Sequence, residues 1–197
     1  MPIRTEEPPR RSVAMVQSTL ARLVADPVFR RRAGVRPVSD DQALGLSTPH
    51  GVFCVEVEQL RRDGLEAAQP TSTRFIVLQG DRTIGSAETR LDDEGRPGAF
   101  ANVAQGAEVD GFVDGLARSE KHPRTAKESF ELRVLRVNEL HLQALWLRAE
   151  SGRDVIVPSE PAFPPFSAGE PLEVEEFLRL VDEAARSRPD TERPVEG

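Results

Sequence analysis

The sequence is poor in the residue types that carry most catalytic chemistry. It has no tyrosine, one cysteine, one tryptophan and three histidines among 197 residues. A single cysteine excludes an internal disulfide framework and suits a reducing compartment, so we expect a cytoplasmic protein. The sequence also lacks paired metal-ligand motifs and glycine-rich phosphate-binding motifs, so we expect neither a metal nor a cofactor.

Long apolar runs are absent as well. No stretch approaches the roughly 20 residues of a membrane span. The N-terminal segment has no continuous apolar region and no small-residue cleavage site, which argues against a secretory signal. Lysine is nearly absent, and arginine carries the positive charge. Together with abundant alanine, this is typical of a GC-rich bacterial genome.

The charge is negative overall and unevenly distributed. The net charge of −7 argues against general nucleic-acid binding. Residues 1–36 hold eight arginines against three acidic residues, which leaves residues 37–197 with a net charge of −12. This polarity can orient a partner, or it can help one half of the chain pack on the other.

The first third of the chain is predicted to be mainly helical. Residues 1–11 are charged and proline-rich, and we expect them to be disordered. Apolar residues then recur at helical spacing from residue 12. Asp26-Pro27 and Thr48-Pro49 each combine a capping residue with a first-turn proline, which is typical of a helix start. We therefore predict a helical module over residues 12–67, with its last helix at 50–67, and a linker over 69–73.

The remainder predicts a sheet. Alternating or continuous apolar residues favour six strands, and amphipathic spacing favours two helices. The predicted strands are 75–78, 83–91, 99–103, 130–137, 140–147 and 155–157, and the predicted helices are 107–119 and 173–186. Strands interrupted by a helix indicate an α+β domain at 74–186, with a mostly antiparallel sheet and helices on one side. Residues 187–197 are expected to be a disordered tail.

The segment around Trp146 is predicted to form the centre of this sheet. Leu142, Ala144 and Trp146 alternate on one face, while the apolar phase slips near Val134–Leu135, where we expect a bulge. Helical spacing is also present between residues 137 and 147, so a helix is the alternative. We predict a strand, with Trp146 in the core.

Few residues are candidates for chemistry. His50 and Cys54 are four apart at a predicted helix start, a spacing that permits two metal ligands or a thiolate beside an imidazolium. Cys54 with His141 and an acid permits nucleophilic catalysis. No family signature surrounds them, and the simpler interpretation is a small buried side chain with surface histidines. The Arg30-Arg31-Arg32 cluster fits an acidic peptide or phosphate, although cations at a helix C-terminus also stabilise the helix itself.

Two segments resemble known families. The stretch LARLVADPVFRRRAGV resembles the L-x-x-L-x-x-D-P-x-x-R helical element of small bacterial proteins and of Nif11-type leader peptides. The stretch FELRVLRVNELHLQALWL resembles a strand pair of uncharacterised bacterial proteins. It is also similar to the C-terminal domain of the DUF2063 partner proteins, which work beside multinuclear iron enzymes of peptide modification. Neither segment contains catalytic residues, so the resemblance implies an accessory or recognition protein.

Three functional hypotheses follow from the sequence. The first is a non-catalytic accessory or binding protein that recognises a protein or peptide partner. The second is a small-molecule-binding protein or enzyme with a pocket between sheet and helices. The third is a nucleic-acid binder that uses the arginine-rich N-terminal half, which the overall acidity disfavours.

Overall fold

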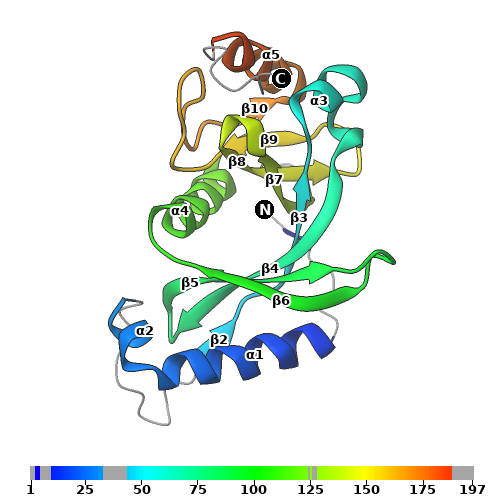
Figure 1. Cartoon of the computed structure of the whole chain (residues 1–197). Coiled ribbons are helices and arrows are strands. Elements are labelled where there is room, and N and C mark those ends of the chain that lie inside the picture. Colours follow the sequence, from blue (N-terminus) through cyan, green and yellow to red (C-terminus); the bar gives the residue numbers. More distant parts are fainter. Residues whose placement is uncertain (1–2, 5–9, 33–43, 124, 126–127, 188–197) are drawn as a thin grey trace, which may run out of the picture.

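The computed structural model describes residues 3–4, 10–32, 44–123, 125 and 128–187 (Figure 1). The helices are α1 (Arg10–Ala25), α2 (Pro27–Arg32), α3 (Val57–Asp63), α4 (Ala107–Lys121) and α5 (Val174–Ser187). The strands are β1 (Ile3–Arg4), β2 (Leu44–Leu46), β3 (His50–Cys54), β4 (Gln69–Gln79), β5 (Arg82–Leu91), β6 (Pro97–Ala104), β7 (Phe130–Val137), β8 (Leu142–Ala149), β9 (Val155–Pro158) and β10 (Leu172–Glu173).

All ten strands belong to one sheet. Its order is β10-β9-β8-β7-β3-β4-β5-β6, with β1 beside β7 and β2 beside β4. Every neighbouring pair is antiparallel except β1–β7 and β3–β7, which are parallel. The predicted α+β class and the mostly antiparallel sheet are therefore confirmed. Among the described residues the sheet has ten strands rather than about six, because β1, β2, β3 and β10 were not predicted; β3 lies between β4 and β7 and connects the two groups of strands.

Helices cover both faces of the sheet. On β8, Ala144 and Trp146 lie in an apolar cluster with α3 and α5, while the alternate residues Leu145 and Leu147 lie in a second cluster with α4. A third cluster joins α1 to β4 and β5 on the same face as α3 and α5. Figure 1 shows α1 at the β4–β6 end and α5 at the β8–β10 end. The prediction of helices on one side was wrong, because both faces carry apolar side chains.

The N-terminal region differs most from its prediction. Residues 50–54 form a strand at the centre of the sheet, and the predicted helix at 50–67 is reduced to α3 and a short 3₁₀ turn (Gly64–Ala67). The segment 44–46 is also a strand, and the predicted linker at 69–73 is the first half of β4. The region from 12 to 67 is therefore not purely helical. The Asp26 cap is confirmed, since its Oδ1 accepts a hydrogen bond from the Val28 amide at 2.7 Å.

The centre of the sheet agrees with its prediction, except that the expected bulge is absent and the second strand begins at residue 142 rather than 140. Residues 130–137 and 142–149 are paired antiparallel strands, and the helical alternative was wrong. No bulge interrupts this pairing, because Val134 and Leu135 are both buried, one on each face. The turn between the strands is a 3₁₀ turn (Asn138–Leu140) followed by His141, whose φ of 49° makes it the left-handed residue. The disordered tails were predicted at 1–11 and 187–197. Within them, residues 3–4 form β1, residues 10–11 begin α1 and Ser187 ends α5, so the prediction was wrong there. Residues 1–2, 5–9 and 188–197 lie outside the described residues.

Candidate functional site

Five polar side chains gather on the face of the sheet that α4 covers. We call them the ionic cluster: Arg74 on β4, Glu88 on β5, Glu108 on α4, Arg136 on β7 and Gln143 on β8. Arg74 is fully buried, and the side chain of Glu88 is 3% exposed. Glu108 and Arg136 are more accessible, at 40% and 23%, so the cluster reaches solvent through them.

Glu88 lies between the two guanidinium groups. Its Oε1 accepts hydrogen bonds from Nε of Arg74 and from Nη2 of Arg136, both at 2.7 Å. Its Oε2 accepts a bond from Nη1 of Arg136 at 3.1 Å, and the Ser72 hydroxyl donates to the same oxygen at 3.1 Å. One carboxylate is thus held by two arginines and a hydroxyl, which fixes its geometry.

The second half of the cluster joins the sheet to α4. Nη2 of Arg74 donates to Oε1 of Glu108 at 2.8 Å and to Oε1 of Gln143 at 2.9 Å. Two arginines and two glutamates balance each other formally, so the cluster carries no net charge. Buried charges are tolerated only when paired and hydrogen-bonded in this way.

The protonation of the cluster follows from its geometry. Burial favours the neutral form of Glu88, but the charges and hydrogen bonds of Arg74 and Arg136 outweigh burial and hold the pKa of the carboxyl below its usual range. Burial also acts against the charged form of Arg136, but Glu88 raises the pKa of that guanidinium above its usual value. Both groups are therefore charged at neutral pH, and neither is poised to transfer a proton.

His50 lies beside this cluster. It is the antiparallel register partner of Arg74, and its ring stacks on Phe112 of α4 with 5.0 Å between ring centroids. Burial and the charge of Arg74 lower the pKa of His50 from 6.5 to about 4. His50 is therefore neutral at pH 7.

Acidification should lower the stability of the protein, because His50 is buried in its neutral form. The folded state resists protonation of His50, whereas the unfolded chain protonates near pH 6.5. The contribution of His50 is thus complete above pH 6.5 and decreases as the pH falls towards about 4. We expect the free energy of unfolding to decrease by about 3 kcal/mol between pH 7 and pH 4 from this group.

Urea unfolding between pH 7 and pH 4 measures this slope. His50→Phe keeps a ring against Phe112 and should flatten it, whereas the surface change His141→Asn should not. The stabilisation from Glu88 is complete at neutral pH and is lost only below about pH 4.5, because its pKa is lowered in the folded state. Most of the change from His50 occurs above that pH, so the two groups act in separable ranges. An unchanged slope in His50→Phe contradicts the assignment.

The candidate residues for metal binding or nucleophilic catalysis are not assembled. His50 and Cys54 share a face of β3, but four residues of extended chain place them about 13 Å apart. Cys54 is half-buried, with its Sγ 3.5 Å from the Thr71 hydroxyl, and His141 is exposed in the turn before β8. Within the described ranges, no three His, Cys, Asp or Glu side chains gather as metal ligands.

The arginine cluster is only partly described. Arg30, Arg31 and Arg32 belong to α2, and Arg31 is exposed. The side chains of Arg30 and Arg32 lie outside the described residues. Val28, also on α2, is 49% exposed.

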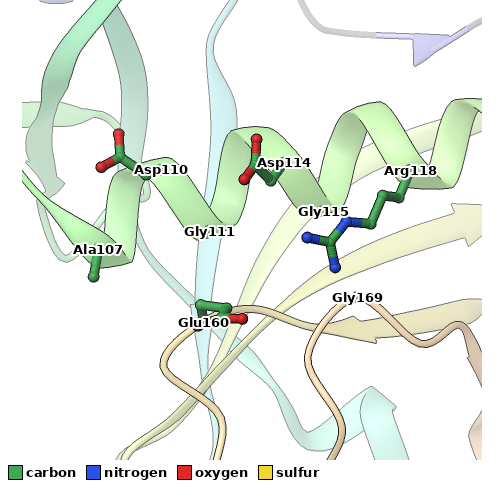
Figure 2. Close-up of a pocket in the computed structure, with 8 residues that line it drawn as sticks. All are labelled: Ala107, Asp110, Gly111, Asp114, Gly115, Arg118, Glu160 and Gly169. Atoms are coloured by element: carbon green, nitrogen blue, oxygen red, sulfur yellow. The ribbon is translucent and has the colours of Figure 1, made fainter.

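The surface cavities among the described residues include one beside α4 and one beside α5. The first has a volume of about 360 Å³ between α4 and the segment 160–169, and it is lined by Asp110, Asp114 and Arg118 (Figure 2). Gly111 lets this segment approach α4, because a Cβ there would lie 2.6 Å from Cβ of Glu160. The second, of about 790 Å³, lies near Asp154 and the start of α5. His50, Cys54 and His141 line neither cavity.

The outer edge of the sheet is a different kind of candidate. β6 is the terminal strand of the sheet and has the sequence PGAFANVA, without a charged residue. Within the described part of the chain, no strand pairs with its other side. Register shifts separate Asn102 from Phe100 and Phe100 from Pro97, so the segment Phe100–Ala104 pairs regularly with β5 at Asn102–Ala104 and contains one irregular position, Ala101. We call this segment the open edge.

The apolar cluster beneath the open edge is incompletely buried. Among the described residues, the cluster with α1 has five fully buried and six partly buried members, whereas the cluster with α4 has twelve and four. Val13 of α1 and Phe100 and Val103 of the open edge are three of the partly buried members. The opposite edge differs, because β10 has two residues and leads directly into α5.

Comparison with known proteins adds no assignment. No family model, no curated protein and no solved structure matches the chain. Among the described helices, none has the length and apolar character needed to cross a membrane.

The ionic cluster and the open edge were both missed from the sequence. Glu88 is a charged residue inside the predicted strand 83–91, and Arg74 lies immediately before the predicted strand 75–78; opposite charges in or beside strands are a signal for a buried ion pair. Their partners come from three other segments, α4, β7 and β8, and one sequence does not show which strands are neighbours. The open edge required the strand order, which local periodicity does not contain.

Proposed function

We propose that this protein is a non-catalytic interaction protein that binds an extended segment of a protein partner as an additional strand beside β6. The observation that carries the proposal is the uncharged, unpaired open edge. An exposed edge strand presents a row of backbone donors and acceptors, and natural proteins usually block such edges with charges, proline, bulges or a covering element. Phe100–Ala104 contains neither charge nor proline, and its one irregularity is the register shift at Ala101.

The partly buried apolar cluster supports the same proposal. An added strand beside the open edge would lie over the flank of α1, where Val13, Phe100 and Val103 are half-buried. Alternate side chains of that strand would cover these residues, which gives the binding an apolar contribution in addition to backbone hydrogen bonds. Because the open edge has no charge, the expected partner segment is uncharged and apolar at every second position.

The state of the polar residues favours binding over catalysis. The charged groups of the ionic cluster are engaged with one another, and the pKa shifts of Glu88 and Arg136 move both groups away from neutral pH. A general acid or base works best with a pKa near the working pH. Binding of a peptide strand requires no such group.

Selection from a library of random twelve-residue peptides displayed on phage tests the proposal. We expect enriched peptides to carry apolar residues at alternate positions. Asn102→Lys places a charge on the open edge at an exposed position and should weaken binding of these peptides at least about tenfold. The matched control is Gln69→Lys, which places the same charge at an exposed position of the interior strand β4 and should leave binding unchanged.

Amide hydrogen exchange provides a second readout. Bound peptide should slow exchange of amides in Phe100–Ala104 and leave those of β9 unchanged. Two results contradict the proposal: selection without any alternating apolar pattern, or peptides that bind Asn102→Lys as tightly as the unmodified chain.

A further inference from the structure

Four buried polar atoms beneath α4 have no hydrogen-bond partner among the described residues. They are Nε2 of His50, Nη1 of Arg74, Nε2 of Gln143 and Oγ of Ser159. His50, Arg74 and Ser159 are 5%, 0% and 1% exposed. Buried polar groups without partners are costly, so an arrangement of several in one region indicates a bound polar molecule.

Two of these atoms belong to neighbouring residues, His50 and Arg74. β3 and β5 flank β4 on opposite sides, and Arg74 is paired in register with His50 on one and Glu88 on the other. Nε and Nη2 of Arg74 are the atoms engaged with Glu88, Glu108 and Gln143, which leaves Nη1 on the remaining side of the guanidinium. Both side chains lie against the ring of Phe112, with Cζ of Arg74 5.7 Å from its centroid.

The two atoms have opposite hydrogen-bonding character. Nη1 of Arg74 is only a donor. His50 is neutral, and its hydrogen bond with the Thr48 backbone engages the other ring nitrogen as the donor. Nε2 of His50 is therefore an acceptor. A molecule between them must accept from arginine and donate to histidine at the same time.

This requirement selects the chemical class of the ligand. A carboxylate or a fully ionised phosphate only accepts hydrogen bonds, and an ammonium group only donates them. A hydroxyl does both. Because both side chains are almost completely buried, the smallest hydroxyl-bearing molecule fits best, and polar interiors commonly hold such molecules.

We propose that an ordered water molecule is bound between Nη1 of Arg74 and Nε2 of His50 and connects β3 to the ionic cluster. The water accepts a hydrogen bond from the guanidinium and donates one to the imidazole. Nε2 of Gln143 and the Ser159 hydroxyl lie on the same face of the sheet and provide further hydrogen-bonding capacity around the site.

A crystal structure of the full chain at a resolution that shows ordered water tests the proposal directly. The expected result is a water oxygen within hydrogen-bonding distance of both named nitrogen atoms. A direct hydrogen bond between Arg74 and His50 overturns the proposal. A buffer anion on Arg74, with a protonated His50, overturns it as well.

Solution measurements separate this water from a crystal effect. Oxygen-17 relaxation dispersion counts long-lived water molecules, and His50→Phe should have one fewer per chain, whereas His141→Asn should have the same number as the unmodified protein. Nitrogen-15 spectra of His50 in the unmodified chain should show Nε2 unprotonated at pH 7. A protonated Nε2 overturns the proposal even if the His50→Phe variant does not fold.

Discussion

Glu88→Gln should lower the free energy of unfolding by about 3–5 kcal/mol at pH 7. The change keeps the shape of the side chain but removes the negative charge that faces Arg74 and Arg136. The side chain is 3% exposed, so water does not replace the lost interaction. Two buried guanidinium groups would then share only Glu108, and the amide of the new glutamine would direct donors towards donors. Urea unfolding of the variant measures the loss.

Glu131→Gln is the matched control for Glu88→Gln. Glu131 pairs with Arg133 at 2.7 Å on β7, but its side chain is 38% exposed. Exposed ion pairs contribute little, so we expect a loss below about 1 kcal/mol. Arg74→Met combined with Glu88→Gln should cost less than the sum of the two single changes, since it removes one charge of each sign. Equal losses for Glu88→Gln and Glu131→Gln would contradict a buried role for the cluster.

The sheet region was predictable because its strands have strong local signals. The strands at 83–91 and 130–137 and the helix after Gly106 appear close to their predicted positions. Gly80 and Gly152 occupy turns with φ of 58° and 78°, which glycine adopts without strain. Local pattern and tertiary packing favour the same structure in these segments.

The central strand β3 was missed because local and tertiary preferences disagree there. Thr48-Pro49 resembles a helix start, and the sequence after it also fits helical spacing. The structure instead pairs β3 with β4 on one side and β7 on the other, which buries Val52 completely. The gain from pairing on both sides outweighs a weak helix preference, and only the three-dimensional arrangement reveals it.

The same limitation applies to the site. His50 was singled out as a metal ligand or as a partner of Cys54, whereas its neighbours in the fold are Arg74 and Phe112. Neither neighbour is near it in sequence. The apolar face of β8, in contrast, was predicted from the alternation of apolar residues alone.

Trp146→Ala should lower the free energy of unfolding by about 3–5 kcal/mol. Trp146 is 3% exposed and shares its cluster with Leu142 and Ala144, as its alternating phase predicted. Its indole N–H donates to Oδ2 of Asp154 at 2.6 Å, so the polar atom of the ring is satisfied. The guanidinium of Arg133 lies over the ring at 4.9 Å. Removal of the ring leaves a cavity, an unpaired carboxylate oxygen and an arginine without its aromatic partner.

Thermal unfolding and peptide binding should be measured together on Trp146→Ala and Trp146→Phe. Trp146→Phe keeps an aromatic ring and loses the hydrogen bond to Asp154, so its loss of stability should be smaller than that of Trp146→Ala. Four strands, β7, β3, β4 and β5, separate β8 from the open edge, so peptides selected on β6 should bind any folded variant equally well. If binding disappears while the melting temperature stays within about 2 °C, Trp146 belongs to a binding surface and not to the core.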